Sequence, residues 1–173
     1  LTDVTDREAA HTALVQSEQR YRRMFDASRI GVAEEDWTSV RLALQALNVD
    51  KADLGDYLER NPDFVRSARP LARIKAANPA LQRMVSAGDS SAFLESVDKL
   101  LSEGERTFAG ALVAFARGEP FYEGETELVG LDGRRIPVLF TITFPAEPDG
   151  DRDVLAFVIG ITERKHSQDA LLA

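Results

Sequence analysis

The last third of the sequence contains three strand-forming segments in a row. Aromatic and β-branched residues are concentrated in Phe121–Leu131, Ile136–Phe144 and Val154–Ile161. The dipeptides Asp132-Gly133 and Asp149-Gly150 separate them, and such pairs favour the positive φ angles of tight hairpin turns. Because strands joined by hairpins run antiparallel, the sequence predicts a three-stranded meander here.

Two shorter strands are predicted earlier, at Ile30–Ala33 and Ala72–Ala77. Apolar residues recur every three or four positions between and after them, and Asp36, Asn61-Pro62 and Asn78-Pro79 are typical helix starts. The chain has 173 residues, of which 44% are hydrophobic, and this fits one globular domain. The pattern therefore predicts an α+β fold with a five-stranded antiparallel sheet interrupted by helices.

A long helix is predicted over Asp6–Asp26, which contains neither Gly nor Pro. Its apolar positions alternate in spacings of four and three, as in a coiled-coil seam. This seam predicts either a homodimer or an amphipathic helix that packs on its own domain, and we favour the dimer. The residues assigned to the dimer interface are Ala10, Leu14, Tyr21 and Met24, with Ser17 as a weak point in the seam.

Composition excludes several kinds of site. The sequence has no cysteine, and its histidines, His11 and His166, lie in the predicted terminal helices. Disulfides, thiolate metal sites, haem bound through a core histidine and flavin-cysteinyl photochemistry are therefore excluded, no metal ligands are assigned, and the cofactor stays unknown. The net charge of −8 argues against nucleic acid as a partner.

The sequence also gives expectations about location. No apolar run is long enough to span a membrane, and no signal peptide is visible. The absence of cysteine is typical of a reducing compartment, so we expect a cytoplasmic domain without membrane contact. The chain opens without an initiator Met, which suggests a piece of a longer protein. Any membrane anchor of that protein would lie outside this window.

The chain begins with a phrase close to the one with which it ends. LTDVTDREAAHTALV and VIGITERKHSQDALL align without a gap, so that Thr5-Asp6-Arg7 corresponds to Thr162-Glu163-Arg164. A chance match between two charged helices is one explanation. We favour the other, in which similar units follow one another in series and each ends with this phrase.

Several motifs, in order, resemble those of PAS sensory domains. The terminal phrase of both copies resembles the Asp-Ile-Thr-Glu-Arg-Lys phrase that ends such domains. The other motifs resemble the phrase before the first PAS strand, the asparagine-to-helix junction after the second strand, and the fourth strand with its turn. They are Ser17-Glu18-x-x-Tyr21-Arg22-x-Met24-Phe25, Ala77-Asn78-Pro79-Ala80, Phe121-Tyr122-Glu123-Gly124-Glu125 and Asp132-Gly133-Arg134.

The resemblance implies a domain plan. Residues 1–27 would be a linker helix that begins with the tail of an upstream PAS domain, and residues 163–173 would begin a C-terminal linker helix. Residues 28–162 would form a PAS-like five-stranded antiparallel sheet with helices on one face. A helical block at 36–70 lies where ordinary PAS domains pass directly between the first two strands. This indicates an insertion-bearing subfamily of the type found in sensor histidine kinases.

The resemblance also implies a function. Such PAS domains are non-catalytic modules of multidomain signalling proteins, typically sensor histidine kinases or cyclic-dinucleotide enzymes. They sense a small ligand in the core, dimerise, or do both, and relay the result through coiled linkers. A kinase or other output domain in the same chain would be the partner. The alternative is a ligand-free dimerisation and relay module with a filled core.

A ligand cavity is expected between the sheet and the helix that follows Gly104. The residues assigned to it are Trp37, Arg73, Phe108, Leu112, Phe115, Phe140, Ile142 and Phe157. Phe157 and Ile159 are placed on the same sheet face as Phe140 by strand alternation. A catalytic alternative would use the alternating acids Glu123, Glu125 and Glu127, which more commonly form a solvated sheet face.

Signal relay is assigned to the exit of the last strand. The family phrase has Asp where this sequence has Gly160, and that Asp usually anchors the linker through a basic partner. Without it, Arg134 or Arg135 would lack a carboxylate at this position, and the helix after Glu163 would be held by few contacts. The residues assigned to the relay are Arg134, Gly160, Ile161 and Thr162.

Overall fold

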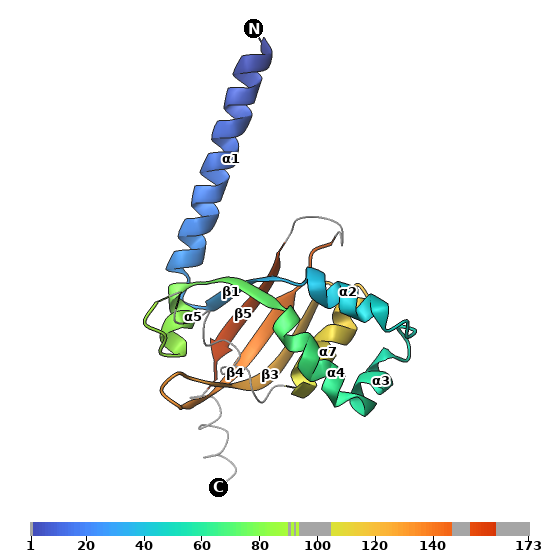
Figure 1. Cartoon of the computed structure of the whole chain (residues 1–173). Helices are drawn as coiled ribbons and strands as arrows, with labels where there is room; N and C mark the ends of the chain where they lie inside the picture. Colours follow the sequence, from blue (N-terminus) through green and yellow to red (C-terminus); the bar gives the residue numbers. More distant parts are fainter. Residues whose placement is uncertain (1, 90, 92, 94–104, 147–152, 162–173) are drawn as a thin grey trace.

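The computed structural model describes residues 2–89, 91, 93, 105–146 and 153–161. Its centre is a five-stranded, fully antiparallel sheet in the order β2-β1-β5-β4-β3 (Figure 1). The strands are β1 (Gly31–Asp36), β2 (Arg73–Ala77), β3 (Phe121–Val129), β4 (Arg135–Thr143) and β5 (Val154–Gly160). The α+β architecture predicted from the sequence is confirmed.

The meander forms as predicted. β3 and β4 pair along their whole length, and the turn between them contains Gly133 at φ 84°, which a residue with a side chain rarely adopts. Asp132 closes this turn by accepting the Arg134 amide at 3.1 Å. The second predicted turn, Asp149-Gly150, lies outside the described residues.

The first strand is longer than predicted. It continues from Ala33 to Asp36 because Glu34 and Glu35 pair with Leu155 and Val154 of β5. The polar composition of this end concealed the strand. Strand pairing with two neighbours decides the structure here, against the low strand propensity of acidic residues.

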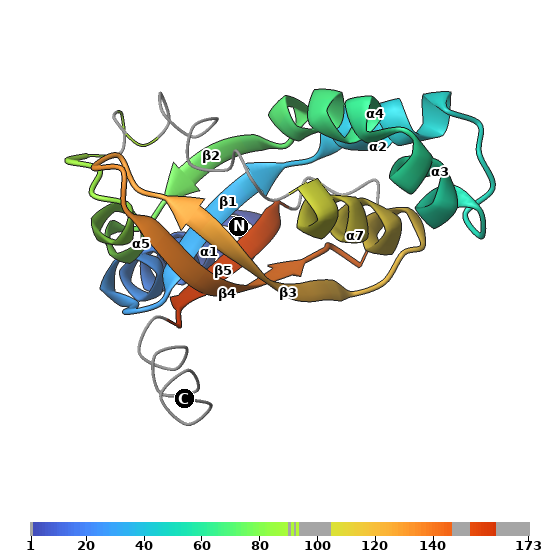
Figure 2. The ribbon, with the colours of Figure 1, turned by 90° about the horizontal axis from the view of Figure 1, so that it is seen from below.

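The segment between β1 and β2, called the inserted block below, is helical as predicted. It comprises α2 (Thr38–Ala46), α3 (Leu54–Arg60), α4 (Pro62–Ala68) and a short 3-10 helix, η1 (Arg69–Leu71). Asp36 starts α2 by accepting both the amide and the hydroxyl of Thr38. Figure 2 shows α2, α3 and α4 grouped with α7 (Glu105–Ala116) on one side of the sheet.

Helix α7 packs on β3 and on α3 and α4. Its buried stripe includes Ala111 and Leu112, both fully buried. The predicted end of this helix at Gly118 is confirmed, because Gly118 adopts φ 72°. The Gly118 amide donates to the Phe115 carbonyl, and the Glu119 amide donates to the Ala114 carbonyl. This helix forms the wall that faces the sheet across the core.

Asn78 joins three elements at the other end of the sheet. It precedes α5 (Pro79–Met84) and is the buried polar residue of the described core, with no exposed surface. Its side-chain oxygen accepts the Val32 and Leu81 amides, and its nitrogen donates to the Phe25 and Ile30 carbonyls, all within 3.0 Å. The end of α1 (Thr2–Ala27), the start of β1 and α5 are therefore fixed to one side chain.

Helix α1 projects from the sheet (Figure 1). Three seam residues expose large apolar surfaces: Leu14 is 58%, Tyr21 45% and Met24 68% exposed, and Ala10 is also exposed. Tyr21 nevertheless contacts its own domain, because its hydroxyl donates to Glu34 at 2.6 Å and its ring packs on Phe25. Burial, and next the Glu34 hydrogen bond, raise the pKa of Tyr21 above its usual range.

Candidate functional site

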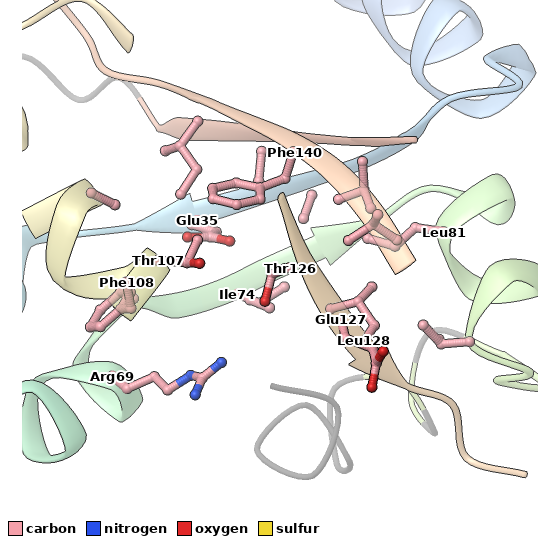
Figure 3. Close-up of a pocket in the computed structure, with 18 of the residues that line it drawn as sticks. Glu35, Arg69, Ile74, Leu81, Thr107, Phe108, Thr126, Glu127, Leu128 and Phe140 are labelled. Carbon is pink, nitrogen blue, oxygen red and sulfur yellow. The ribbon is translucent and has the colours of Figure 1, made fainter. Parts of the chain in front are cut away.

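A cavity of about 120 Å³ lies between α7 and the inner face of the sheet (Figure 3). Most of its wall is apolar. Side chains from all five strands, from α5 and α7, and from the end of the inserted block contribute to it. The lining residues used below are Ala33, Glu35, Trp37, Arg69, Ile74, Thr107, Phe108, Ala111, Thr126, Glu127, Phe140, Ile142, Ala156 and Val158.

Four of the residues predicted to bind ligand line this cavity. They are Trp37, Phe108, Phe140 and Ile142. Phe140 can lie flat towards β3 because its cross-strand partner is Gly124, where an added Cβ would come within 3.2 Å of the ring. The prediction of a cavity between this helix and the sheet therefore has a physical counterpart in the structure.

Four other predicted residues do not line the cavity. Leu112 is fully buried elsewhere in the core, and Phe115 packs against Trp37 and Phe144. Arg73 is exposed, because it alternates with the inward-facing Ile74 on β2. Phe157 lies on the opposite face of the sheet.

The placement of Phe157 corrects the strand alternation expected from the sequence. Phe140 pairs with Val158 and Ile142 with Ala156, so these smaller residues face the cavity. Phe157 and Ile159 therefore point to the outer face, where Ile159 is 44% exposed. Strand alternation correctly groups Phe157 with Ile159, but only the register with the neighbouring strand decides which face that group takes. Small residues on the inner face leave space for the cavity.

Glu35 is the functional candidate that the sequence reasoning missed. Glu35 lines the cavity (Figure 3). It lies on the same face of β1 as Ala33, and its Oε2 accepts the Trp37 indole N–H at 2.6 Å. Burial raises the pKa of Glu35 to about 7, and the Trp37 hydrogen bond opposes that shift. Carboxyl groups in apolar cavities with raised pKa values are typical of functional sites.

A register shift places the residues around Glu35. Glu34 pairs with Ala76 of β2 but Glu35 pairs with Ile74, so Lys75 is the extra residue of a β-bulge. Ile74 therefore faces the cavity, while the Lys75 ammonium binds Asp153 at 2.9 Å. A signal was present in the sequence, because Ala33, Glu35 and Trp37 follow strand alternation into the core.

Trp37 holds one end of the cavity through aromatic contacts. It is 3% exposed, and its ring centroid lies 5.8 Å from Phe108, 5.2 Å from Phe115 and 5.4 Å from Phe144. The edge-to-face arrangement with Phe115 and Phe144 is the favoured geometry for aromatic pairs. Trp37 therefore both packs the core and lines the cavity.

Of the remaining polar lining groups, Glu127, Thr107 and Arg69 interact within the protein, whereas the Thr126 hydroxyl makes no hydrogen bond with the described residues. Glu127 binds Arg135 at 3.0 Å, and the Thr107 hydroxyl donates to the Glu125 carbonyl at 3.4 Å. The Arg69 side chain is also engaged by the protein, and it extends towards the cavity in Figure 3. Within the described ranges, no three acidic, histidine or cysteine side chains cluster as metal ligands would.

The residues assigned to signal relay lie near the exit of β5. Arg134 binds Asp132 of its own turn at 2.7 Å, and Arg135 binds Glu127, so both arginines have carboxylate partners other than a residue at position 160. Gly160 is exposed, whereas Ile161 is buried and its amide N–H donates to the Pro137 carbonyl at 2.9 Å. Thr162 and the predicted linker helix lie outside the described residues.

Two of the three alternating acids of β3 are exposed, as on a solvated sheet face, whereas the third, Glu127, also lines the cavity. Glu123 and Glu125 are exposed, and Glu127 pairs with Arg135 at the rim. No helix in the described part of the chain combines the length and the apolar character that membrane crossing needs.

The fold resembles that of several solved structures. A domain of a sensory-box sensor histidine kinase/response regulator from Geobacter sulfurreducens has a TM-score of 0.51 at 16% identity, covering 84% of this chain and 95% of that one. A PAS domain from Colwellia psychrerythraea has a TM-score of 0.54 at 14% identity, covering 84% and 98%. An RNA-binding light-oxygen-voltage receptor has a TM-score of 0.58 at 13% identity, covering 89% and 36%.

No family model and no curated protein sequence matches the chain. At these identities the solved structures establish the fold alone. Two of them are described as PAS or sensory-box domains, and both are covered almost completely by the match. The chain has the PAS domain fold.

Proposed function

We propose that the chain is the sensory module of a longer signalling protein, which binds a small ligand in the cavity and relays its occupancy to the terminal helices. The observation that carries this proposal is the cavity itself. It is apolar, about 120 Å³ in volume, and contains a carboxyl group with its pKa raised to about 7. Cavities of this kind are the usual sites for small molecules.

A route from the cavity to α1 supports the relay. Adjacent residues of β1 face opposite sides of the sheet: Glu35 lines the cavity, and Glu34 accepts the Tyr21 hydroxyl of α1. The bulge lies between these two residues. A ligand that moves Glu35 would therefore shift the residue that holds α1. The parent protein would be a sensor histidine kinase or a cyclic-dinucleotide enzyme, with the output domain in the same chain.

Two experiments test the sensory role: a search for a ligand that the purified chain retains, and a substitution that fills the cavity. Native mass spectrometry of the purified chain should show a bound small molecule that is released on denaturation. Ala111→Leu should abolish retention while changing the free energy of unfolding by less than about 1 kcal/mol, because the added carbons enter the cavity.

Ala114→Leu is the matched control, since Ala114 is buried on the same helix but does not line the cavity. Overpacking there should cost about 1–3 kcal/mol. A ligand-free chain in which Ala111→Leu costs as much as Ala114→Leu would favour the alternative function, a dimerisation and relay module with a filled core.

We also propose a homodimer through α1. Leu14 and Met24 lie on the seam, and a projecting helix needs a partner to bury such a stripe. Leu14→Glu with Met24→Glu should convert a dimer into a folded monomer in light scattering. The control, Gln16→Glu with Gln19→Glu, makes the same change in charge on the opposite side of the helix and should stay dimeric. A dimer that survives the seam substitutions would place the interface elsewhere.

A further inference from the structure

We propose that the cavity selects a small, neutral aromatic molecule with one hydrogen-bond donor, and that the Glu35 carboxyl accepts this donor. The inference rests on the proposed function, because it names the class of ligand that the sensory cavity takes. Phenols, anilines and azoles belong to this class.

Cavity size and walls define the ligand body. The cavity of about 120 Å³ is close to one of about 150 Å³, which admits benzene. Trp37, Phe108 and Phe140 present aromatic surfaces, and aromatic pairs gain from offset and edge-to-face contacts. A single flat ring fits this space, whereas a fused cofactor such as flavin is too large.

The hydrogen-bonding capacity of Glu35 defines the polar group. Its Oε2 is taken by the Trp37 N–H, and its Oε1 has no hydrogen-bond partner in the part of the chain that the structure describes. Thr107, which lines the same cavity, donates to the Glu125 carbonyl, and one oxygen of Glu127 accepts from Arg135, while the Thr126 hydroxyl is a neutral and therefore weaker acceptor in the same wall. A ligand N–H or O–H would satisfy the second oxygen without moving Trp37, and hydrogen bonds to charged groups are the stronger ones.

The charges around the cavity favour a neutral ligand. A carboxylate ligand would meet the Glu35 carboxyl as well as the Arg69 guanidinium, and an ammonium would meet Arg69 as well as Glu35, so a ligand of either charge meets a like charge in the cavity. Taking an additional charge out of water into this apolar space carries a desolvation penalty that a single hydrogen bond does not offset. The cavity therefore discriminates by charge as well as by size.

Four probes of similar size test the inference on the 173-residue chain. Phenol and toluene have the same shape but differ in the donor, while benzoate and benzylammonium add a charge of either sign. Calorimetry or ligand-observed NMR at pH 8, where the Glu35 carboxyl is ionised, should show phenol binding about tenfold or more tightly than toluene, because the hydrogen bond is then made to a charged group. Both charged probes should bind more weakly than phenol.

Two substitutions identify the acceptor. Glu35→Leu should remove the preference for phenol and leave toluene binding intact. Glu35→Gln keeps a neutral acceptor and should keep part of the preference, which guards against a poorly folded leucine variant. Glu123→Leu, on the exposed outer face, is the matched control and should keep the full preference.

The outcomes separate this inference from the proposed function. Equal binding of phenol and toluene, a phenol preference that survives Glu35→Leu, or tightest binding of a charged probe would each overturn the inference while leaving a ligand cavity. Binding of none of the four probes, together with no retained small molecule, would overturn both.

Discussion

Asn78→Ala should lower the free energy of unfolding by about 4 kcal/mol, because each buried polar group left without a partner costs about 1–3 kcal/mol. The substitution would orphan the amides of Val32 and Leu81 and the Phe25 carbonyl, whereas the Ile30 carbonyl would keep the Ser28 hydroxyl as a donor at 3.1 Å. Water that enters the space would recover part of the loss. Chemical denaturation followed by circular dichroism measures the change.

Asn61→Ala is the matched control for this effect. Asn61 also precedes a proline at a helix start, but it is only partly buried and its side chain makes one recorded hydrogen bond, to the Tyr57 carbonyl at 2.8 Å. Its loss should cost about 1 kcal/mol. Asn78→Asp keeps the shape of the side chain but places an oxygen against two carbonyls, so it should also be strongly destabilising. If the substitutions at positions 61 and 78 lowered the free energy of unfolding by similar amounts, Asn78 would not be the residue that anchors α1 and β1.

The sequence was informative where a local rule decides the structure. Both predicted Asn-Pro helix starts were confirmed at Pro62 and Pro79, because Pro needs no amide partner in the first turn; Asn78 also accepts the Leu81 amide, whereas the Asn61 side chain makes no cap hydrogen bond. Gly118 and Gly133 marked a helix end and a turn because both require positive φ. The fold class followed from these boundaries and from the strand-forming segments between them.

The candidate site was predicted only in part because it depends on pairing between distant strands. The inward positions of β5 follow from the register Phe140↔Val158, which single-strand patterns do not reveal. The larger Phe157 was therefore assigned to the cavity in place of Ala156. The bulge beside Glu35 likewise changes which residues of β2 face inward. As a result Ile74 lines the cavity and Arg73, which was predicted to bind ligand, does not.

The stability of the chain should fall as pH rises from about 4.5 to 7, by about 2–3 kcal/mol through Glu35 alone. Burial raises the pKa of Glu35 from 4.5 to about 7 in the folded chain. Between these values the folded chain holds a proton that the unfolded chain has released. Raising the pH therefore favours unfolding, and the full cost is reached above pH 7. Partial access to solvent reduces the effect below the limit of about 1.4 kcal/mol per pKa unit.

Glu35→Gln isolates this contribution because it removes the titrating group and keeps an acceptor for the Trp37 N–H. Urea denaturation from pH 5 to pH 8 should show the variant gaining about 2–3 kcal/mol on the wild type across this range. Glu123→Gln makes the same change on the exposed outer face and serves as the matched control. Arg69 and Glu127 also line the cavity, but both are present in every variant, so their contributions cancel in the comparison. Parallel pH profiles for the wild type and Glu35→Gln would mean that water reaches the carboxyl freely. In that case the cavity would be too wet to discriminate phenol from toluene, and the assignment of Glu35 as the ligand acceptor would fail with it.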